Sequence, residues 1–340
     1  MELSVLPRLE IDSAQEFFSE GRCPATVSRP ELVLFDVPVP VALRQFGESV
    51  HASALGDPLN PSVVVLGGIS ANCFPALKPD GTPGWWSNLA GEGRSIDPSQ
   101  FHIIGVDFAA DDSGTAAPST ADQAQVLAAA LDVIKVDRPV VIVGASYGAM
   151  VGLALAEAQP ERVERLVIVS GADEPHPAST AARELQRRVV ALGQLAGCGD
   201  EALSIARGLA MLTYRTPEEF AERFEGGIED DSTLCCSEPG AYLRSRGQAF
   251  RSVMSPGRFL SLSASIDRHG VDASKVDAPC LIIGADSDQL VFAEQLRRLA
   301  DRLGDEAELH LLDSLYGHDM FLKEAERVGR LIEPFLTDRG

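Results

Sequence analysis

Short apolar runs separated by longer helical patterns dominate this chain. Six runs of mostly β-branched and aliphatic residues occur at 63–66, 102–106, 140–143, 166–169, 280–283 and 309–312. Residues 120–134 and 149–158 have instead the spacing of amphipathic or buried helices. Apolar runs without alternating polar positions are typical of parallel strands covered by helices on both faces. The sequence therefore predicts an α/β fold, with a mostly parallel sheet between two layers of helices.

The strand pattern stops between about Pro175 and Asp277. Helical spacing replaces it, and helices are expected at 181–195, 201–214, 217–224 and 241–250. This segment lies between two core strands, so we expect it over the C-terminal edge of the sheet, where α/β proteins bind ligands. The predicted organisation is a core of residues 1–175 and 277–340 with an inserted helical lid at 176–276. Residues 1–30 show no strong pattern.

Charge and composition narrow the classes of partner. The chain carries 29 basic against 50 acidic residues, a formal charge of -21, which opposes binding to nucleic acid or to an anionic membrane. No leader-like segment opens the chain and no apolar run approaches the ~20 residues of a membrane span, so a cytoplasmic protein is expected. Neither the histidines nor the cysteines have metal-ligand or C-x-x-C spacing, and we expect reduced thiols, no metal and no bound cofactor. The cysteines are Cys23, Cys73, Cys198, Cys235, Cys236 and Cys280.

A candidate nucleophile follows one of the predicted strands. Gly144-Ala-Ser146-Tyr-Gly148 stands directly behind the apolar run at 139–143. Glycines on both sides of the serine allow the sharp strand-to-helix turn of a nucleophile elbow. The backbone amide of Tyr147 would then face a developing oxyanion, and the amide of Ile69, in Gly67-Gly-Ile-Ser70, would be the second donor. An ordinary glycine-rich turn is the alternative interpretation of each motif.

A serine nucleophile needs a base and an acid that orients the base. His318, in a loop after the last predicted strand, is the candidate base; the alternative is a surface histidine. Asp286 and Asp288 compete as the acid after the strand at 280–283. We favour Asp288, because it precedes an apolar dipeptide that packing can hold in place. Either aspartate could instead cap the next helix.

Several further motifs resemble the homoserine O-acyltransferases of the α/β-hydrolase fold, over most of the chain. The resembling segments are Gly67-Gly-Ile-Ser-Ala71, Gly84-Trp-Trp86, Gly144-Ala-Ser-Tyr-Gly-Ala-Met150, Ala206-Arg-Gly-Leu-Ala-Met-Leu-Thr-Tyr-Arg215, Glu222-Arg-Phe224, Tyr242-Leu243 and Tyr316-Gly-His-Asp-Met-Phe-Leu322. The Ser-Tyr-Gly-Ala-Met version and the compact stretch 107–118 are most similar to the succinyl-transferring branch and depart from the acetyl-transferring pattern.

The resemblance implies substrate-binding roles for Arg207, Tyr214 and Asp319. Arginine offers a bidentate fork for an α-carboxylate and aspartate a negative charge for an α-ammonium. Arg207 and Tyr214 are seven residues apart in a helical pattern, so they project from one face of one helix. The structural alternatives are a solvated arginine, a packed tyrosine, and an aspartate that caps the last helix.

The resemblance implies a function as well. The expected reaction is transfer of an acyl group, succinyl in preference to acetyl, from acyl-CoA through Ser146 to L-homoserine, in methionine biosynthesis. A homodimer is expected too, as is usual in this family. Candidate residues for the phosphates of coenzyme A are Arg183, Arg187, Arg188, Arg244, Arg246 and Arg251. Alternative functions are a serine esterase or thioesterase, an O-acyltransferase acting on L-serine, and a non-catalytic binding protein with this fold.

Overall fold

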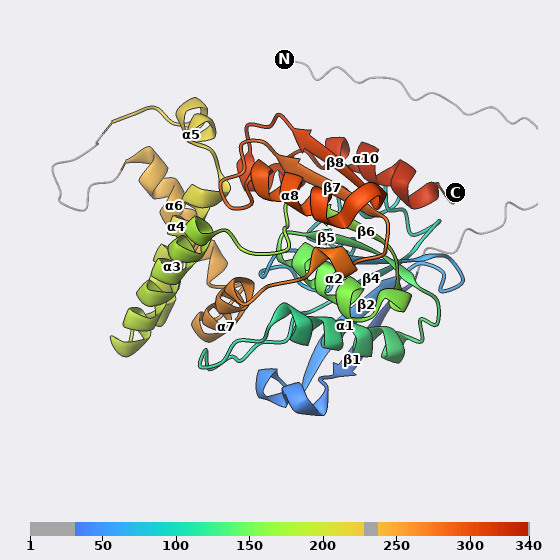
Figure 1. Ribbon diagram of the computed structural model, residues 1–340. Helices are drawn as coiled ribbons and strands as arrows, with labels where there is room; N and C mark the ends of the chain where they lie inside the picture. The colour runs from blue at the N-terminus through green and yellow to red at the C-terminus, as the bar shows by residue number, and fades with distance from the viewer. Residues whose placement is uncertain (1–30, 228–236, 339–340) are drawn as a thin grey trace, which may run out of the picture.

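A single eight-stranded sheet forms the centre of the molecule (Figure 1). The computed structural model describes residues 31–227 and 237–338. The strands follow the order β1-β2-β4-β3-β5-β6-β7-β8, with β1 and β2 antiparallel to their neighbours and the other pairs parallel. Their bounds are β1 Leu32–Pro38, β2 Ser49–Leu55, β3 Ser62–Leu66, β4 His102–Val106, β5 Val140–Ala145, β6 Val163–Val169, β7 Cys280–Ala285 and β8 Ala307–Leu312.

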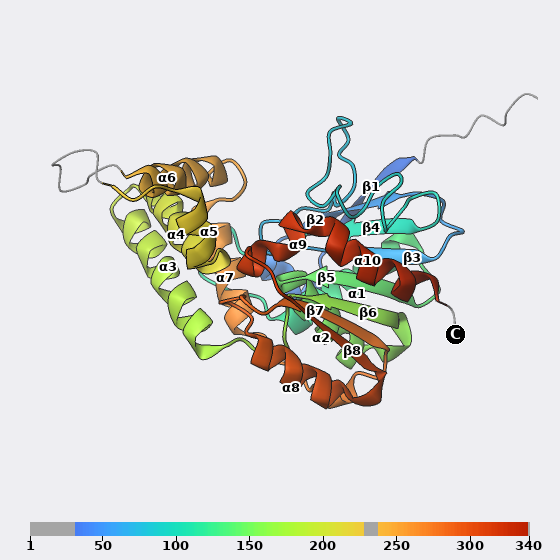
Figure 2. The ribbon, with the colours of Figure 1, turned by 90° about the horizontal axis from the view of Figure 1, so that it is seen from above.

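Helices cover both faces of the sheet. Figure 2 shows α1 (Thr120–Ile134), α2 (Tyr147–Ala158) and α8 (Ala293–Leu303) on one side. On the other side are α9 (Met320–Lys323) and α10 (Ala325–Thr337). Two buried clusters fill the space between these layers, one on each side of the sheet. The predicted fold class is confirmed, and strands β3 to β6 are buried over most of their length because both faces are covered.

In the described part of the segment between β6 and β7, five α-helices are present. They are α3 Pro177–Leu195, α4 Gly199–Tyr214, α5 Pro217–Arg223, α6 Glu238–Phe250 and α7 Pro256–Asp267. In both ribbon views α3, α4 and α6 stand together beyond one end of the sheet, and α7 lies between them and the sheet (Figures 1 and 2). The first four correspond to predicted helices. The division into core and lid, and the role of a lid, stay predictions.

Three elements were not anticipated from the sequence. The first two are β1 and β2, which extend the six predicted strands at one edge. β1 is exposed at four of its seven positions, although it begins with the apolar run Leu32-Val-Leu-Phe35, for which no strand was predicted. The third is α7, which is rich in serine and has few aliphatic residues. For α7, packing against the rest of the molecule outweighs a weak local signal.

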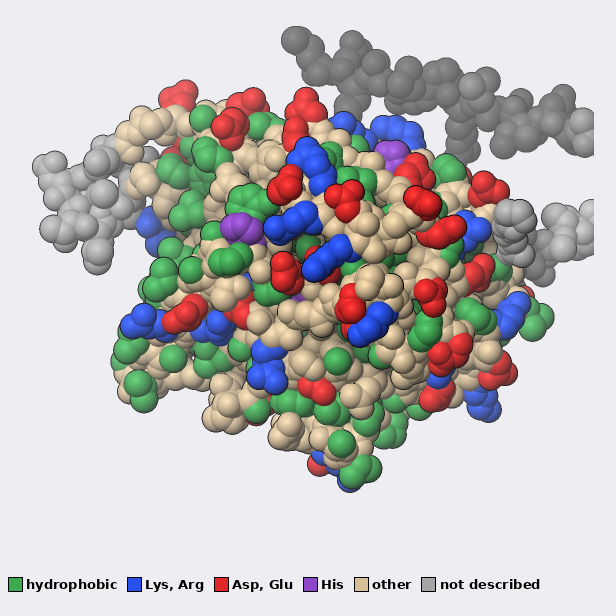
Figure 3. Space-filling view, viewed as in Figure 1, with side chains coloured by type: hydrophobic (Ala, Val, Ile, Leu, Met, Phe, Trp, Pro, Cys, Tyr) green, Lys and Arg blue, Asp and Glu red, His purple; other side chains and the backbone are tan. Residues whose placement is uncertain are grey.

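Acidic and basic side chains are interspersed over the face viewed in Figure 3. No helix in the described part of the chain is long and apolar enough to cross a membrane. Within the same residues, no group of three His, Cys, Asp or Glu side chains could hold a metal ion. Cys73 and Cys280 are buried free thiols, and Cys198 is exposed. Cys23, Cys235 and Cys236 lie outside the described residues.

Candidate active site

Ser146 lies on a sharp turn between β5 and α2. Its backbone has a positive φ of 54° with a ψ of -117°, a combination that a residue other than glycine rarely adopts. The turn also requires close approach of the flanking chain: a Cβ at Gly148 would lie 2.4 Å from the carbonyl oxygen of Leu66, and one at Gly144 would lie 2.5 Å from the Cα of Ala149. Both glycines are therefore needed for this geometry, which presents the serine hydroxyl at the end of the strand.

The loop after β8 brings His318 to this serine. The Nε2 atom of His318 is 2.9 Å from Oγ of Ser146, and its Nδ1 atom is 2.8 Å from Oδ2 of Asp288. The other carboxylate oxygen of Asp288 accepts hydrogen bonds from the amides of Leu290 and Val291, at 2.8 and 3.1 Å. These bonds hold the acid in place from its own loop. A hydroxyl, an imidazole and a carboxylate thus form one connected chain of hydrogen bonds.

The neighbouring Asp286 lies differently. It is exposed, and its backbone amide donates to the carbonyl of Leu312. Of the two aspartates that the sequence left in competition, Asp288 contacts His318.

Opposing influences act on the pKa of His318. Burial of the imidazole acts to lower the pKa, but the charge and hydrogen bond of Asp288, together with the charge of Asp319, outweigh burial and raise it above its usual value. Arg183 has a smaller lowering influence. Because a base of raised pKa holds a proton more firmly, His318 is suited to accept the proton of the serine hydroxyl.

The backbone amides predicted to bind an oxyanion belong to Ile69 and Tyr147. Tyr147 is the first residue of α2, where the helix has no internal acceptor for its amide. Ile69 follows β3 and lines the hollow in front of Ser146. Neither amide donates to another group within residues 31–227 and 237–338. The tyrosine side chain serves a separate purpose, since its buried hydroxyl lies 2.5 Å from Oγ of Ser265 on α7.

A hollow of about 170 Å³, here called the Arg207 hollow, opens in front of Ser146. The structure brings the three predicted substrate-binding residues to its lining: Arg207 and Tyr214 from α4, and Asp319 from the loop that carries His318. The guanidinium of Arg207 lies over the ring of Tyr214, 5.1 Å from its centre. The Tyr214 ring in turn is 5.7 Å from the ring of His318. The prediction that two of the residues share one face of one helix therefore agrees with their positions.

Asp319 also has a partner that sequence reasoning missed. Nε of Arg215 is 3.4 Å from Oδ2 of Asp319, and Nη1 of the same guanidinium is 2.5 Å from Oε1 of Glu219. Side-chain exposure is 6 % for the arginine, 8 % for the glutamate and 15 % for the aspartate. Helical i, i+4 spacing does not explain the pairing of Arg215 with Glu219, because Arg215 is an extended residue that precedes the N-cap of α5. No local signal connects them with Asp319.

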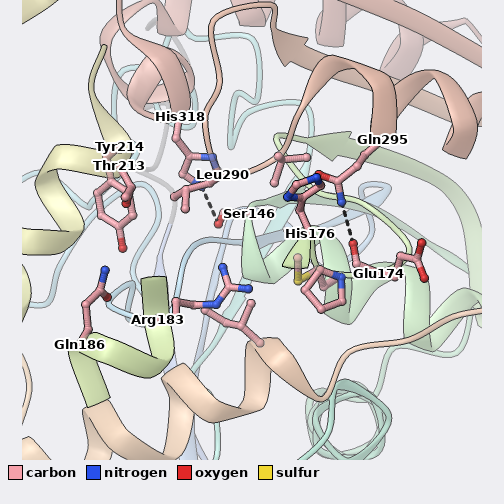
Figure 4. Close-up of a pocket in the computed structure, with 14 residues that line it drawn as sticks. Ser146, Glu174, His176, Arg183, Gln186, Thr213, Tyr214, Leu290, Gln295 and His318 are labelled. Atoms are coloured by element: carbon pink, nitrogen blue, oxygen red, sulfur yellow. Dashed lines mark hydrogen bonds between the residues drawn. The ribbon is translucent and has the colours of Figure 1, made fainter. Parts of the chain in front are cut away.

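A second hollow, here called the Arg183 hollow, reaches Ser146 from the side of α3 (Figure 4). Arg183 and Gln186 extend into it from that helix. The Nε and Nη2 atoms of Arg183 donate to Oδ1 of Asp267 on α7, at 2.8 and 2.6 Å. Arg187 pairs with the other oxygen of Asp267 at 2.7 Å. Two guanidinium groups therefore share one carboxylate beside this hollow.

The arginines suggested for coenzyme A occupy different environments. Arg183 and Arg187 belong to the pairing with Asp267. Arg251 is half-exposed and lies 3.4 Å from Asp200. Arg188, Arg244 and Arg246 belong to α3 and α6, and none of them lines the two hollows at Ser146. Among the six candidates only Arg183 lines a hollow that contains the serine.

Comparison with known proteins gives consistent results. The family described as having the alpha/beta hydrolase fold matches residues 61–325. A homoserine O-succinyltransferase from Xanthomonas campestris pv. campestris is 37% identical, over 92% of this chain and 86% of that protein. A homoserine O-acetyltransferase from Thermus thermophilus is 28% identical, over 82% of this chain and 80% of that protein.

Solved structures share the fold at lower sequence identity. The crystal structure of esterase E22 has a TM-score of 0.79 at 20% identity, and covers 90% of this chain and 100% of its own. The homoserine O-acetyltransferase of Bacillus anthracis also has a TM-score of 0.79, at 15% identity, and covers 91% of this chain and 98% of its own.

Proposed function

Because the chain belongs to the homoserine O-acyltransferases of the α/β-hydrolase fold, we propose that it transfers a succinyl group from succinyl-CoA to the side-chain hydroxyl of L-homoserine. The observation that carries this proposal is the charge pattern of the Arg207 hollow, which suits a free amino acid. Ser146 would carry the acyl group between the two half-reactions, and the reaction would serve methionine biosynthesis.

The Arg207 hollow has one unbalanced charge of each sign. Arg207 has no carboxylate partner within the described residues, and its guanidinium lies over the rings of Tyr214 and Phe250. Asp319 shares the single guanidinium of Arg215 with Glu219, so this group of three carries a net charge of -1. A zwitterion would balance both sites, with its α-carboxylate on Arg207 and its α-ammonium on Asp319. This pattern favours an amino acid over an ordinary ester as the second substrate.

In the first half-reaction, Oγ of Ser146 attacks the thioester carbonyl while Nε2 of His318 accepts the hydroxyl proton. Asp288 stabilises the resulting imidazolium through Nδ1. The carbonyl oxygen becomes an oxyanion, which the amides of Ile69 and Tyr147 would bind. Collapse of this intermediate breaks the carbon–sulfur bond, and the leaving thiolate takes the proton from His318. The products are free coenzyme A and a serine ester.

In the second half-reaction, the hydroxyl of homoserine gives its proton to His318 and attacks the serine ester. The carbon–oxygen bond to Ser146 then breaks, and Oγ recovers the proton from the imidazolium. Water could attack the same ester, so transfer requires that the amino acid be held close and that water be kept out. We propose that the helices between β6 and β7 act as the lid that does this.

Arg183 supports succinyl as the acyl group. A succinyl chain ends in a carboxylate, which must be neutralised when it enters a buried site. Arg183 and Arg187 share the single carboxylate of Asp267, so this group of three carries a net charge of +1 beside Ser146. The exposed Glu174 also lines the Arg183 hollow. The Nη1 atom of Arg183 donates no hydrogen bond within the described residues, which leaves a donor for the ligand. An acetyl group has no charge to use this site.

The exposed face of α3 and α4 supports a homodimer. Six large apolar side chains lie on these two helices with more than a third of their surface exposed: Leu185, Leu192, Leu195, Ile205, Leu209 and Leu212. Apolar surface of this extent on adjacent helices is typical of a protein interface. We expect the wild-type protein to have a dimer mass in solution and Leu192→Glu to shift it toward the monomer. A monomeric wild type at micromolar concentration would contradict this part of the proposal.

The proposed activity is tested by release of thiol from succinyl-CoA and acetyl-CoA, each with and without L-homoserine, with mass detection of the product. We expect release that depends on homoserine with succinyl-CoA, an O-succinylhomoserine mass, and neither from Ser146→Ala. Replacement of homoserine by L-serine tests the shorter acceptor. Because a pocket distinguishes one methylene by only about 1–3 kcal/mol, slower transfer to serine is compatible with the proposal, whereas faster transfer contradicts it.

Two further variants separate the roles of the hollows. Arg183→Met should lower kcat/KM for succinyl-CoA by about tenfold or more and should leave that for acetyl-CoA within a few-fold. Arg207→Met should impair transfer to homoserine without affecting formation of the acyl-enzyme. Thiol release that ignores the amino acid, in the wild type and in Arg207→Met alike, would identify a hydrolase instead.

A further inference from the structure

The Arg215–Glu219 pair is buried beside the Arg207 hollow and takes part in none of the bond-making or proton-transfer steps just described. We propose that Glu219 is a positioning residue for the acceptor: by engaging Arg215, it prevents that guanidinium from neutralising Asp319. The carboxylate of Asp319 then remains able to bind the α-ammonium of the acceptor. This inference depends on the proposed function, because it assumes an acceptor that carries an ammonium group.

Arg215 makes a hydrogen bond to Glu219 but none to Asp319. Its Nη1 atom donates to Glu219 at 2.5 Å. Its Nε atom lies 3.4 Å from Asp319 but makes no hydrogen bond. Asp319 thus has a nearby positive charge without a strong bond to it. Only Asp319, of these three residues, lines the hollow that contains Ser146.

The first turn of α5 holds Glu219 in this position. Thr216 is the N-cap residue of the helix, and its hydroxyl accepts a hydrogen bond from the amide of Glu219 at 3.0 Å. The same hydroxyl donates to the carbonyl of Leu315 at 2.6 Å, just before the loop of His318 and Asp319. One side chain therefore ties the start of α5 to the loop that carries the base, so Glu219 and Asp319 keep a defined separation.

The net charge of Arg215, Glu219 and Asp319 predicts whether Glu219→Gln strengthens or weakens acceptor binding. Two carboxylates and one guanidinium leave a net charge of -1, and a bound ammonium would make the group neutral. In Glu219→Gln, Arg215 and Asp319 would already neutralise each other, and an added ammonium would leave an excess positive charge in a poorly solvated place. Glu219→Gln keeps the size of the side chain, so we expect it to weaken acceptor binding through charge alone.

The test compares two acceptors, L-homoserine and 4-hydroxybutyrate, which keeps the hydroxyl and the carboxylate but lacks the ammonium. With succinyl-CoA as donor, Glu219→Gln should raise KM for homoserine about tenfold. For 4-hydroxybutyrate, which the wild type should use less well, KM should stay the same or fall. The burst of thiol release that reports formation of the acyl-enzyme should keep its wild-type rate.

Glu222→Gln is the matched control, because it removes the same charge from an exposed position on the same helix. Its KM for both acceptors should equal that of the wild type. If Glu219→Gln fails to fold, Glu219→Asp takes its place, and its weaker contact with Arg215 should produce the same acceptor-dependent loss at smaller size.

Three results would overturn the inference. Unchanged KM for homoserine in Glu219→Gln would mean that Glu219 does not control Asp319. Equal losses with both acceptors would mean a general structural defect. The third result is a KM for homoserine that is higher in the Glu219→Gln, Asp319→Asn double variant than in Asp319→Asn alone. It would mean that Glu219 does not act through Asp319. In each case wild-type transfer to homoserine would leave the proposed function standing, whereas a wild type that transfers to neither acceptor would remove both.

Discussion

A buried histidine outside the active site makes the stability of this protein depend on pH. His269 follows α7 and is 5% exposed. Its Nε2 atom lies 2.9 Å from the carbonyl of Ala172, and Nδ1 lies 2.7 Å from the hydroxyl of Thr120 at the start of α1. Because a carbonyl only accepts, Nε2 carries the proton and donates, and Nδ1 accepts from the threonine. The neutral imidazole therefore satisfies both nitrogen atoms and links α7 to the core.

The pKa of His269 determines how much stability the protein loses at low pH. Burial lowers it to about 4, although the Ala172 carbonyl and the charge of Asp173 act to raise it. In the unfolded chain a histidine has a pKa of about 6.5. Below that pH the unfolded state binds a proton that the folded state does not, so stability falls as the pH falls from about 6.5 toward 4. Between pH 7.5 and 4.5 this linkage removes about 2.5 kcal/mol from the free energy of unfolding.

The measurement is equilibrium unfolding in urea at pH 7.5, 6.0 and 4.5, followed by the fluorescence of Trp85 and Trp86. His269→Gln cannot titrate, so its disadvantage relative to the wild type should shrink by about 2.5 kcal/mol from pH 7.5 to 4.5. His51→Gln, at a side chain that is 75% exposed, is the control for the loss of a histidine. Its difference from the wild type in the free energy of unfolding should not change with pH. A difference between wild type and His269→Gln that stays constant with pH would refute the reasoning.

Three further outcomes are expected around the nucleophile. The pKa of His318 is raised and the reaction needs the neutral imidazole, so kcat/KM should rise with pH through a value above about 6.5. In the thiol-release assay, Asp319→Asn should move this rise to lower pH. A rise at or below pH 6.5 in the wild type would contradict a raised pKa of His318. Gly148→Ala would place a Cβ 2.4 Å from the carbonyl oxygen of Leu66. Urea unfolding should therefore show that the free energy of unfolding falls by about 1–3 kcal/mol, and mass spectrometry should show slower acylation of Ser146. Wild-type values for both quantities would show that the turn can relax. Ser265→Ala removes a partner of the buried Tyr147 hydroxyl and should lower the free energy of unfolding by about 1–3 kcal/mol. An unchanged urea midpoint would mean that this hydroxyl finds another partner.

Local sequence determined the central part of the fold and the position of the candidate nucleophile, Ser146. Mostly apolar runs marked the six strands of the parallel region. In β3 to β7 this is because helices cover both faces of the strand, whereas the edge strand β8 is buried at one position only. The sequence also indicated the turn at Ser146, because the flanking chain approaches Gly144 and Gly148 too closely for a residue with a Cβ. The candidate base and the helix with Arg207 and Tyr214 followed from their order along the chain and from helical spacing.

Only the tertiary structure decided which distant groups meet. The sequence offered both Asp286 and Asp288, and the contact with His318 distinguishes them. It contained no sign that Arg215 would lie between Glu219 and Asp319, because that arrangement depends on how the start of α5 packs against the loop after β8. Periodicity reports which face of an element is buried, but not what it is buried against. Charge balance in the two hollows, and hence the argument for each substrate, therefore required the folded chain.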